Sequence, residues 1–161
     1  MRAIDYLPTV AEIAITIAGF AGIVAVVRSS GDMSIEQTRR VVYLVLVCTV
    51  TVVTALLPGV LTDLGLSASA SAAVSSAILG ISVLGLVGSF LWNIFTGGLN
   101  LIFPKLTYLV AATPTVTATV LVLSSIGVVF SPSYGLLLLG LIVNLLLALW
   151  IFVATMVWAR G

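Results

Sequence analysis

One carboxylate in this chain stands inside a long apolar segment, which makes it the first candidate for chemistry. Glu12 lies about five residues into the apolar run of residues 7–27, or roughly 7 Å along a helix with a rise of 1.5 Å per residue. Thr16 and Gly19 follow four and seven residues later and therefore share a helix face with Glu12. A carboxylate within a membrane is a candidate for binding an ion or a proton.

A simpler interpretation of Glu12 is that it lies at the membrane surface. If the part of the segment that crosses the membrane begins later, the carboxylate lies among the lipid head groups. It is then close to the positive N-terminal end of its helix, where a negative charge is favourable. The sequence leaves both interpretations open.

A second set of polar residues follows one face of the third apolar run, residues 72–95. The residues that lie near this face are Ser75, Ser82, Gly85, Ser89, Asn93 and Thr96. A polar stripe on a membrane helix avoids lipid, so it faces either neighbouring helices or water. Small residues allow helices to approach closely, so packing is the simpler interpretation and a path for ions or solutes is the alternative.

Asn144 stands in the middle of the fifth apolar run, residues 135–158, within the segment Leu-Ile-Val-Asn-Leu-Leu-Leu. An amide at this depth needs a hydrogen-bond partner in another helix, or in the same helix of a second subunit. Its role is then structural, or it lines a path. Pro114 interrupts the fourth run and frees the backbone carbonyl of Val110, which favours a kink there.

The elements that carry these residues are five long apolar runs, covering residues 7–27, 41–61, 72–95, 106–130 and 135–158. Each is long enough to cross a membrane as a helix, and a backbone in lipid must satisfy its own hydrogen bonds. The chain is 61% hydrophobic and 7% charged, against about 25% charged in soluble domains. The sequence predicts an all-α integral membrane protein, a bundle of five transmembrane helices forming a single domain over residues 1–161 with no soluble domain.

Local signals refine the first two helices. Ser34 and Gln37 fit a capping box, which predicts that the second helix begins near Ile35. Small residues recur in steps of three and four along the first run, which predicts close packing of that helix against a neighbour. The residues expected to pack in this way are Ala14, Ala18 and Gly22 in the first run, and Gly85 in the third.

The basic residues predict an orientation. Arg28, Arg39, Arg40, Lys105 and Arg160 all fall on one side of the five-span topology, and Arg2 alone falls on the other. Because basic loops stay in the cytoplasm, we expect a multi-pass protein of the cell membrane with its N-terminus outside and its C-terminus in the cytoplasm.

The residue types that are scarce limit the chemistry. The chain has no His, one Cys (Cys48) and one Lys (Lys105). Metal sites built on His or Cys pairs and Ser-His-Asp triads are therefore unavailable within one chain. We expect no enzyme, catalytic residue, metal or cofactor. The net charge of +1 gives no reason to expect nucleic acid as a partner.

These observations favour a homo-oligomeric channel or transport protein for ions or small solutes in a lipid bilayer. Five spans cannot divide into two equal inverted halves, so any symmetry must come from several copies of the chain. The candidates for an ion or solute path are Glu12, Thr16, Ser82, Ser89, Asn93 and Asn144. The alternative is a non-catalytic interaction or scaffold subunit that associates with a partner membrane protein.

Overall fold

A computed structural model of the protein describes residues 3–28, 35–96 and 104–158, and every regular element in these ranges is helical. The predicted all-helical fold is therefore confirmed for this part of the chain. A short 3₁₀ helix, η1 (Ala3–Tyr6), precedes α1 (Leu7–Arg28). The other helices are α2 (Ile35–Asp63), α3 (Ala68–Phe95), α4 (Pro104–Ser125) and α5 (Tyr134–Trp158).

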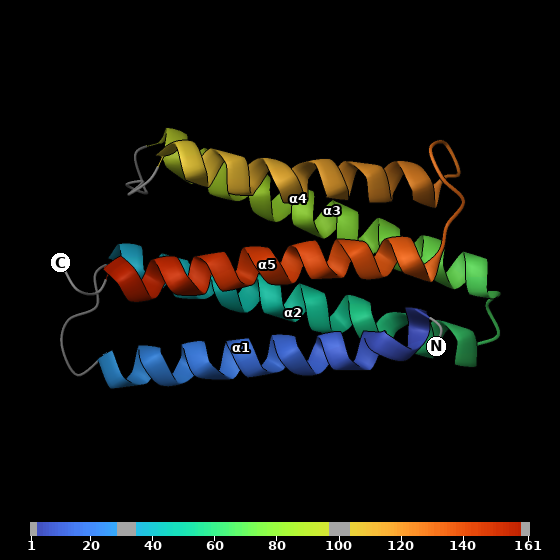
Figure 1. The fold of residues 1–161 in the computed structure, drawn as a ribbon, viewed down its shortest axis with the longest axis horizontal. Coiled ribbons are helices and arrows are strands. Elements are labelled where there is room, and N and C mark those ends of the chain that lie inside the picture. Colours follow the sequence, from blue (N-terminus) through green and yellow to red (C-terminus); the bar gives the residue numbers. More distant parts are fainter. Residues whose placement is uncertain (1–2, 29–34, 97–103, 159–161) are drawn as a thin grey trace.

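The five long helices form a flattened bundle in which consecutive helices run in opposite directions (Figure 1). Among the described residues, helix α5 contacts all four other long helices, whereas the long helices that α1 contacts are α2 and α5, and those that α4 contacts are α3 and α5. The helices α1 and α4 therefore form opposite edges of the bundle. Every neighbouring set of three helices packs as a triangle, so α5 fills the middle of the bundle.

Four of the helical segments are long and apolar enough to cross a membrane: Ala3–Ala25, Thr38–Asp63, Ala68–Asn93 and Tyr134–Thr155. In α4 the described apolar stretch is shorter, Val110–Ser125. Large apolar side chains such as Phe20, Trp92 and Leu146 are exposed on the outside of the bundle. Four helices and an apolar exterior are compatible with a membrane location.

Glycines end two of the helices. At the end of α4, Gly127 has a φ of 74°, and the N–H groups of Gly127 and Val128 donate to the carbonyls of Ser124 and Leu123, both at 3.0 Å. This is the Schellman pattern, which needs a left-handed residue that glycine supplies without strain. Helix α4 therefore stops at Ser125, five residues before the end of the apolar run predicted from sequence. Gly65 ends α2 in the same way, with a φ of 88°.

Serines begin two of the helices. The Ser67 hydroxyl accepts a bond from the Ala70 N–H at 3.3 Å, and the Ser133 hydroxyl accepts one from the Leu136 N–H at 3.4 Å. Each serine is an N-cap that satisfies a donor left free at the start of its helix. Helix α3 accordingly begins at Ala68, four residues before the predicted apolar run, and α2 begins at Ile35, as expected.

Two glycines allow close packing inside the bundle. A Cβ at Gly80 of α3 would come within 2.8 Å of the Ala118 carbonyl oxygen and within 2.6 Å of a Val122 methyl group in α4. A Cβ at Gly140 of α5 would meet Leu121 at 2.5 Å. The backbones of α3 and α4 thus approach to a distance that only glycine permits.

Candidate functional site

Asn144 lies at the centre of the bundle and is bonded to another helix of the same chain. Its side chain is 1% exposed, and its Nδ2 donates to the Thr51 hydroxyl at 2.8 Å and to the Val47 carbonyl at 3.3 Å, both in α2. The Thr51 hydroxyl in turn donates to the same Val47 carbonyl at 2.9 Å. The partner that a buried amide requires is therefore supplied by α2, without a second subunit.

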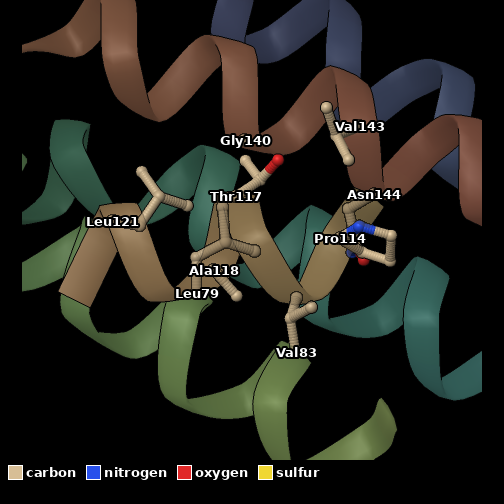
Figure 2. Close-up of a pocket in the computed structure, with 9 residues that line it drawn as sticks. All are labelled: Leu79, Val83, Pro114, Thr117, Ala118, Leu121, Gly140, Val143 and Asn144. Atoms are coloured by element: carbon tan, nitrogen blue, oxygen red, sulfur yellow. The ribbon is translucent and has the colours of Figure 1, made fainter. Parts of the chain in front are cut away.

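The interior around Asn144 is nearly filled. A cavity of about 10 Å³ lies between α3, α4 and α5, with Asn144, Pro114 and Thr117 among the residues that line it. Most of the remaining lining is aliphatic, including Leu79 and Val83 (Figure 2). A cavity of this volume is close to the minimum for one water molecule, so it offers no path for an ion along the bundle.

Ser89 and Asn93 belong to a second polar cluster, at the end of the bundle where α2 begins and α3 ends. Asn93 Nδ2 donates to the Tyr43 hydroxyl at 3.0 Å and to the Ser89 carbonyl at 2.9 Å. The hydroxyls of Tyr43 and Ser89 are also 3.0 Å apart, and Arg39 donates to Asn93 Oδ1 over a long 3.5 Å. These bonds join α2 to α3 near the surface of the bundle.

The polar stripe predicted along α3 is not one continuous site. Ser75 is fully buried, Ser82 is half-buried, and Ser89 and Thr96 are exposed. The physical reason is that these residues are seven apart, and a straight α-helix drifts by about 20° for every seven residues. The stripe therefore turns from the core toward the outside along α3, which separates Ser82 from the cluster at Ser89.

Glu12 and Thr16 lie on the exposed face of α1, at the edge of the bundle and apart from both clusters. The Thr16 hydroxyl donates to the backbone carbonyl of Glu12 at 2.8 Å. The opposite face of α1 is buried in the bundle, with Ala11 and Ala14 at 3% and 0% exposure. The six path candidates thus fall into separate places: Glu12 lies with Thr16 on the outer face of α1, Ser89 lies with Asn93 at the end of α3, and Ser82 and Asn144 are apart from both pairs.

The residues predicted to pack closely differ in how far the other helices of the chain cover them. Ala14 is buried, as a helix seam requires, together with Leu44 and Cys48 of α2, and Ala18 is half-buried. Gly22 and Gly85 are different, because a Cβ at either would meet nothing within 4 Å. Within one chain, these two glycines do not mediate close packing, and that role falls to Gly80 and Gly140.

Ser75 belongs to the polar stripe predicted along the third run, but two further buried polar residues, Ser76 and Ser124, were not selected from the sequence. The hydroxyls of Ser75, Ser76 and Ser124 are buried, and none has a hydrogen-bond partner within the described ranges. Since Gly80 stands against Ala118 and Val122, the antiparallel register brings Ser76 close to the level of Ser124. The serine-rich start of the third run was a signal for Ser76, whereas Ser124 lies near the end of the fourth helix, where no pattern in the sequence singles it out.

These features define an all-helical bundle with four helices suited to crossing a membrane. The sequence matches no protein family, and comparisons with curated proteins and with solved structures give no significant match. No group of three or more His, Cys, Asp or Glu side chains is placed to hold a metal ion within residues 3–28, 35–96 and 104–158.

Proposed function

We propose that the protein is a homo-oligomeric membrane channel or transport protein, whose path for ions or small solutes lies between copies along the outer face of α1. The observation that carries the proposal is the contrast between the nearly filled region around Asn144 and an exposed carboxylate. Inside one chain, Asn144 is hydrogen-bonded and borders a cavity of only about 10 Å³. Outside, Glu12 lies on a face of α1 that residues 3–28, 35–96 and 104–158 leave uncovered.

The depth of Glu12 supports a contact between subunits. Helix α1 ends at Arg28, and a hydrocarbon core of about 30 Å corresponds to about 20 residues of helix. If Arg28 marks one boundary with water, the other boundary falls near Pro8, and Glu12 lies roughly 6 Å inside it. A carboxylate facing lipid at this depth is costly, and a second subunit that covers the face removes that cost.

The shape of this face also suits a neighbouring helix. Thr16, Gly19 and Ile23 continue the line from Glu12, and all are exposed. A Cβ at Gly19 would meet nothing within 4 Å, so another backbone can approach there as it does at Gly80. Among the long helices in the described part of the chain, α1 contacts α2 and α5 alone, so the face is accessible at the edge of the bundle.

The charge of the face favours cations as the transported species. A ring of Glu12 side chains from several copies would place negative charges around a shared axis. Rings of Asp or Glu are a common way for channels to select cations. The Thr16 hydroxyl, one turn further along α1, adds an oxygen on the same side.

The orientation that we propose is a multi-pass protein of the cell membrane with its N-terminus outside and its C-terminus in the cytoplasm. It is supported by Arg39 and Arg40, which stand near the start of α2, at the end of the bundle where α5 ends (Figure 1). Basic residues at that end favour retention on the cytoplasmic side. A reporter fused after Gly161 that appears outside the cell would contradict this orientation.

Flux measurements on reconstituted protein test the function. We expect cation flux in liposomes carrying the wild type, and at least a tenfold loss in Glu12→Gln. The matched control is Asp63→Asn, which neutralises an exposed carboxylate at the end of α2 and should leave the flux unchanged. Absence of flux for several cations and solutes would contradict a channel or transporter. If the protein gave no flux and also co-purified with a different membrane protein, the proposed function would be that of an interaction subunit.

A further inference from the structure

We infer that a single water molecule binds in the cavity between α3, α4 and α5, held by Asn144 Oδ1 and the Thr117 hydroxyl. Such a water would connect α5 to α4 in the middle of the bundle. The inference is independent of the proposed path along α1, because it concerns the interior of one chain.

The hydrogen bonds of Thr51 fix the orientation of the Asn144 amide. The Thr51 hydroxyl has one hydrogen, and it donates that hydrogen to the Val47 carbonyl at 2.9 Å. At the Asn144 side, 2.8 Å away, Thr51 can only accept, so the NH₂ group of Asn144 must face it. The Asn144 oxygen is therefore on the other side of the amide, away from α2.

The oxygen of Asn144 is buried without a donor. Its side chain is 1% exposed, and no hydrogen-bond partner for Oδ1 lies among the described residues. The surrounding cavity wall is mostly aliphatic, and Pro114 has no N–H to donate. The hydroxyl of Thr117 already donates to the Thr113 carbonyl at 2.9 Å. Since buried polar atoms are nearly always hydrogen-bonded, the missing donor must come from a bound molecule.

The volume of the cavity selects that molecule. The cavity measures about 10 Å³, close to the lower limit for one water and too small for any larger polar solute. Purely apolar cavities stay dry, but buried waters occupy sites with polar partners. Here Asn144 Oδ1 accepts one hydrogen of the water, and a lone pair of Thr117 Oγ1 accepts the other. Both residues line the cavity (Figure 2).

The water would give α4 a polar link to the rest of the bundle. The hydroxyls of Thr115, Thr117 and Thr119 all donate to carbonyls of α4 itself. Their hydrogens are thus used within the helix, near the turn that Pro114 weakens by removing one backbone bond. A water between Thr117 and Asn144 connects this turn to α5.

Solid-state NMR in lipid bilayers tests the site directly. The chain has three asparagines, Asn93, Asn100 and Asn144, so labelling asparagine with ¹⁵N gives few side-chain signals, and Asn144→Leu identifies the buried one. We expect magnetisation transfer from water to the Asn144 side chain in the wild type. Absence of transfer to Asn144, while Asn93 at the bundle surface receives it, would overturn the inference.

Two threonine variants locate the water. Thr117→Val keeps the shape of the side chain but removes the second partner, so the transfer to Asn144 should be lost. Thr119→Val is the matched control, because Thr119 is exposed on the same helix and makes the same kind of bond to its own helix. In this variant, the transfer from water to Asn144 should match that of the wild type. An unchanged Asn93 signal verifies folding of each variant. Transfer that persists in Thr117→Val would contradict a water shared between Asn144 and Thr117.

Discussion

Asn144 and Glu12 are both polar residues inside long apolar helices, and the fold treats them in opposite ways. Asn144 is buried and bonded to Thr51 of α2, whereas Glu12 faces out from α1. The chain thus provides acceptors for the NH₂ group of the amide, whereas the residues that the structure describes leave the carboxylate uncovered. A polar residue in a membrane-spanning helix therefore indicates a contact between subunits only when its own chain leaves that residue uncovered.

The glycines near Asn144 and those on α1 also differ in how closely other helices pack against them. Around Asn144, a Cβ at Gly80 or Gly140 would collide with a neighbouring helix. On α1, a Cβ at Gly19 or Gly22 would meet nothing within 4 Å. Glycine is a requirement of the fold in the first region, and in the second the isolated chain gives no reason for it.

The largest effect that would test this contrast comes from a charge at the buried position. We expect Asn144→Asp to lower the free energy of unfolding by about 3 kcal/mol, the approximate cost of Asp at the centre of a membrane helix. The matched control is Asn93→Asp, where a carboxylate lies near Arg39 at the bundle surface and should cost less than about 1 kcal/mol. Unfolding in detergent micelles, titrated with SDS, measures both. Equal losses would show that the interior around Asn144 is hydrated or open.

A smaller effect is expected at the seam between α3 and α4. Gly80→Ala inserts a methyl group against the Ala118 carbonyl, which belongs to the backbone and cannot move aside as a side chain can. We expect a loss of about 1–3 kcal/mol in the free energy of unfolding, as for other overpacked cores. Gly88→Ala on the same helix has open space around it and should cause no loss in the same SDS titration. If Gly80→Ala left the free energy of unfolding unchanged, α3 and α4 would lie further apart than in this structure.

The sequence predicted the helices well, because their signals are local. Apolar length and the long Leu-rich run around Asn144 each depend on neighbours in the chain. Helix α2 begins at Ile35 as expected, and Ser34 of the predicted capping box lies outside the described residues. The exceptions also have local causes. The apolar residues from Ile126 to Phe130 were assigned to the fourth helix, but Gly127 adopts a left-handed conformation and ends that helix after Ser125.

The candidate site was less predictable, because it depends on which helices meet. The sequence showed that Asn144 needs a partner but could not choose Thr51, which is 93 residues away. Spacing also grouped Ser75, Ser82 and Ser89 on one face, although the drift of a straight helix separates them. The exposure of Glu12 follows from the packing of Ala11 and Ala14 against the bundle. The spacing of small residues along α1 predicted that the face of Ala14 packs, but it did not indicate which helix that face meets.

The smallest effect on folding, and the most direct test of the outer face, is expected from Glu12→Gln. In the SDS titration, Glu12 on the exposed face of α1 meets detergent head groups and water in place of lipid, so its replacement should change the free energy of unfolding by less than about 0.5 kcal/mol. Assembly should respond instead. In a background where the buried Cys48 is replaced by Ala, Gly19→Cys should form disulfide-linked dimers in bilayers, and Gly88→Cys, exposed on α3, should not. Adding Glu12→Gln to the Gly19→Cys protein should reduce the linked fraction, since the carboxylate is the group that a second copy covers. Equal cross-linking at both positions would mean that copies meet at random. It would contradict a specific subunit contact at Glu12.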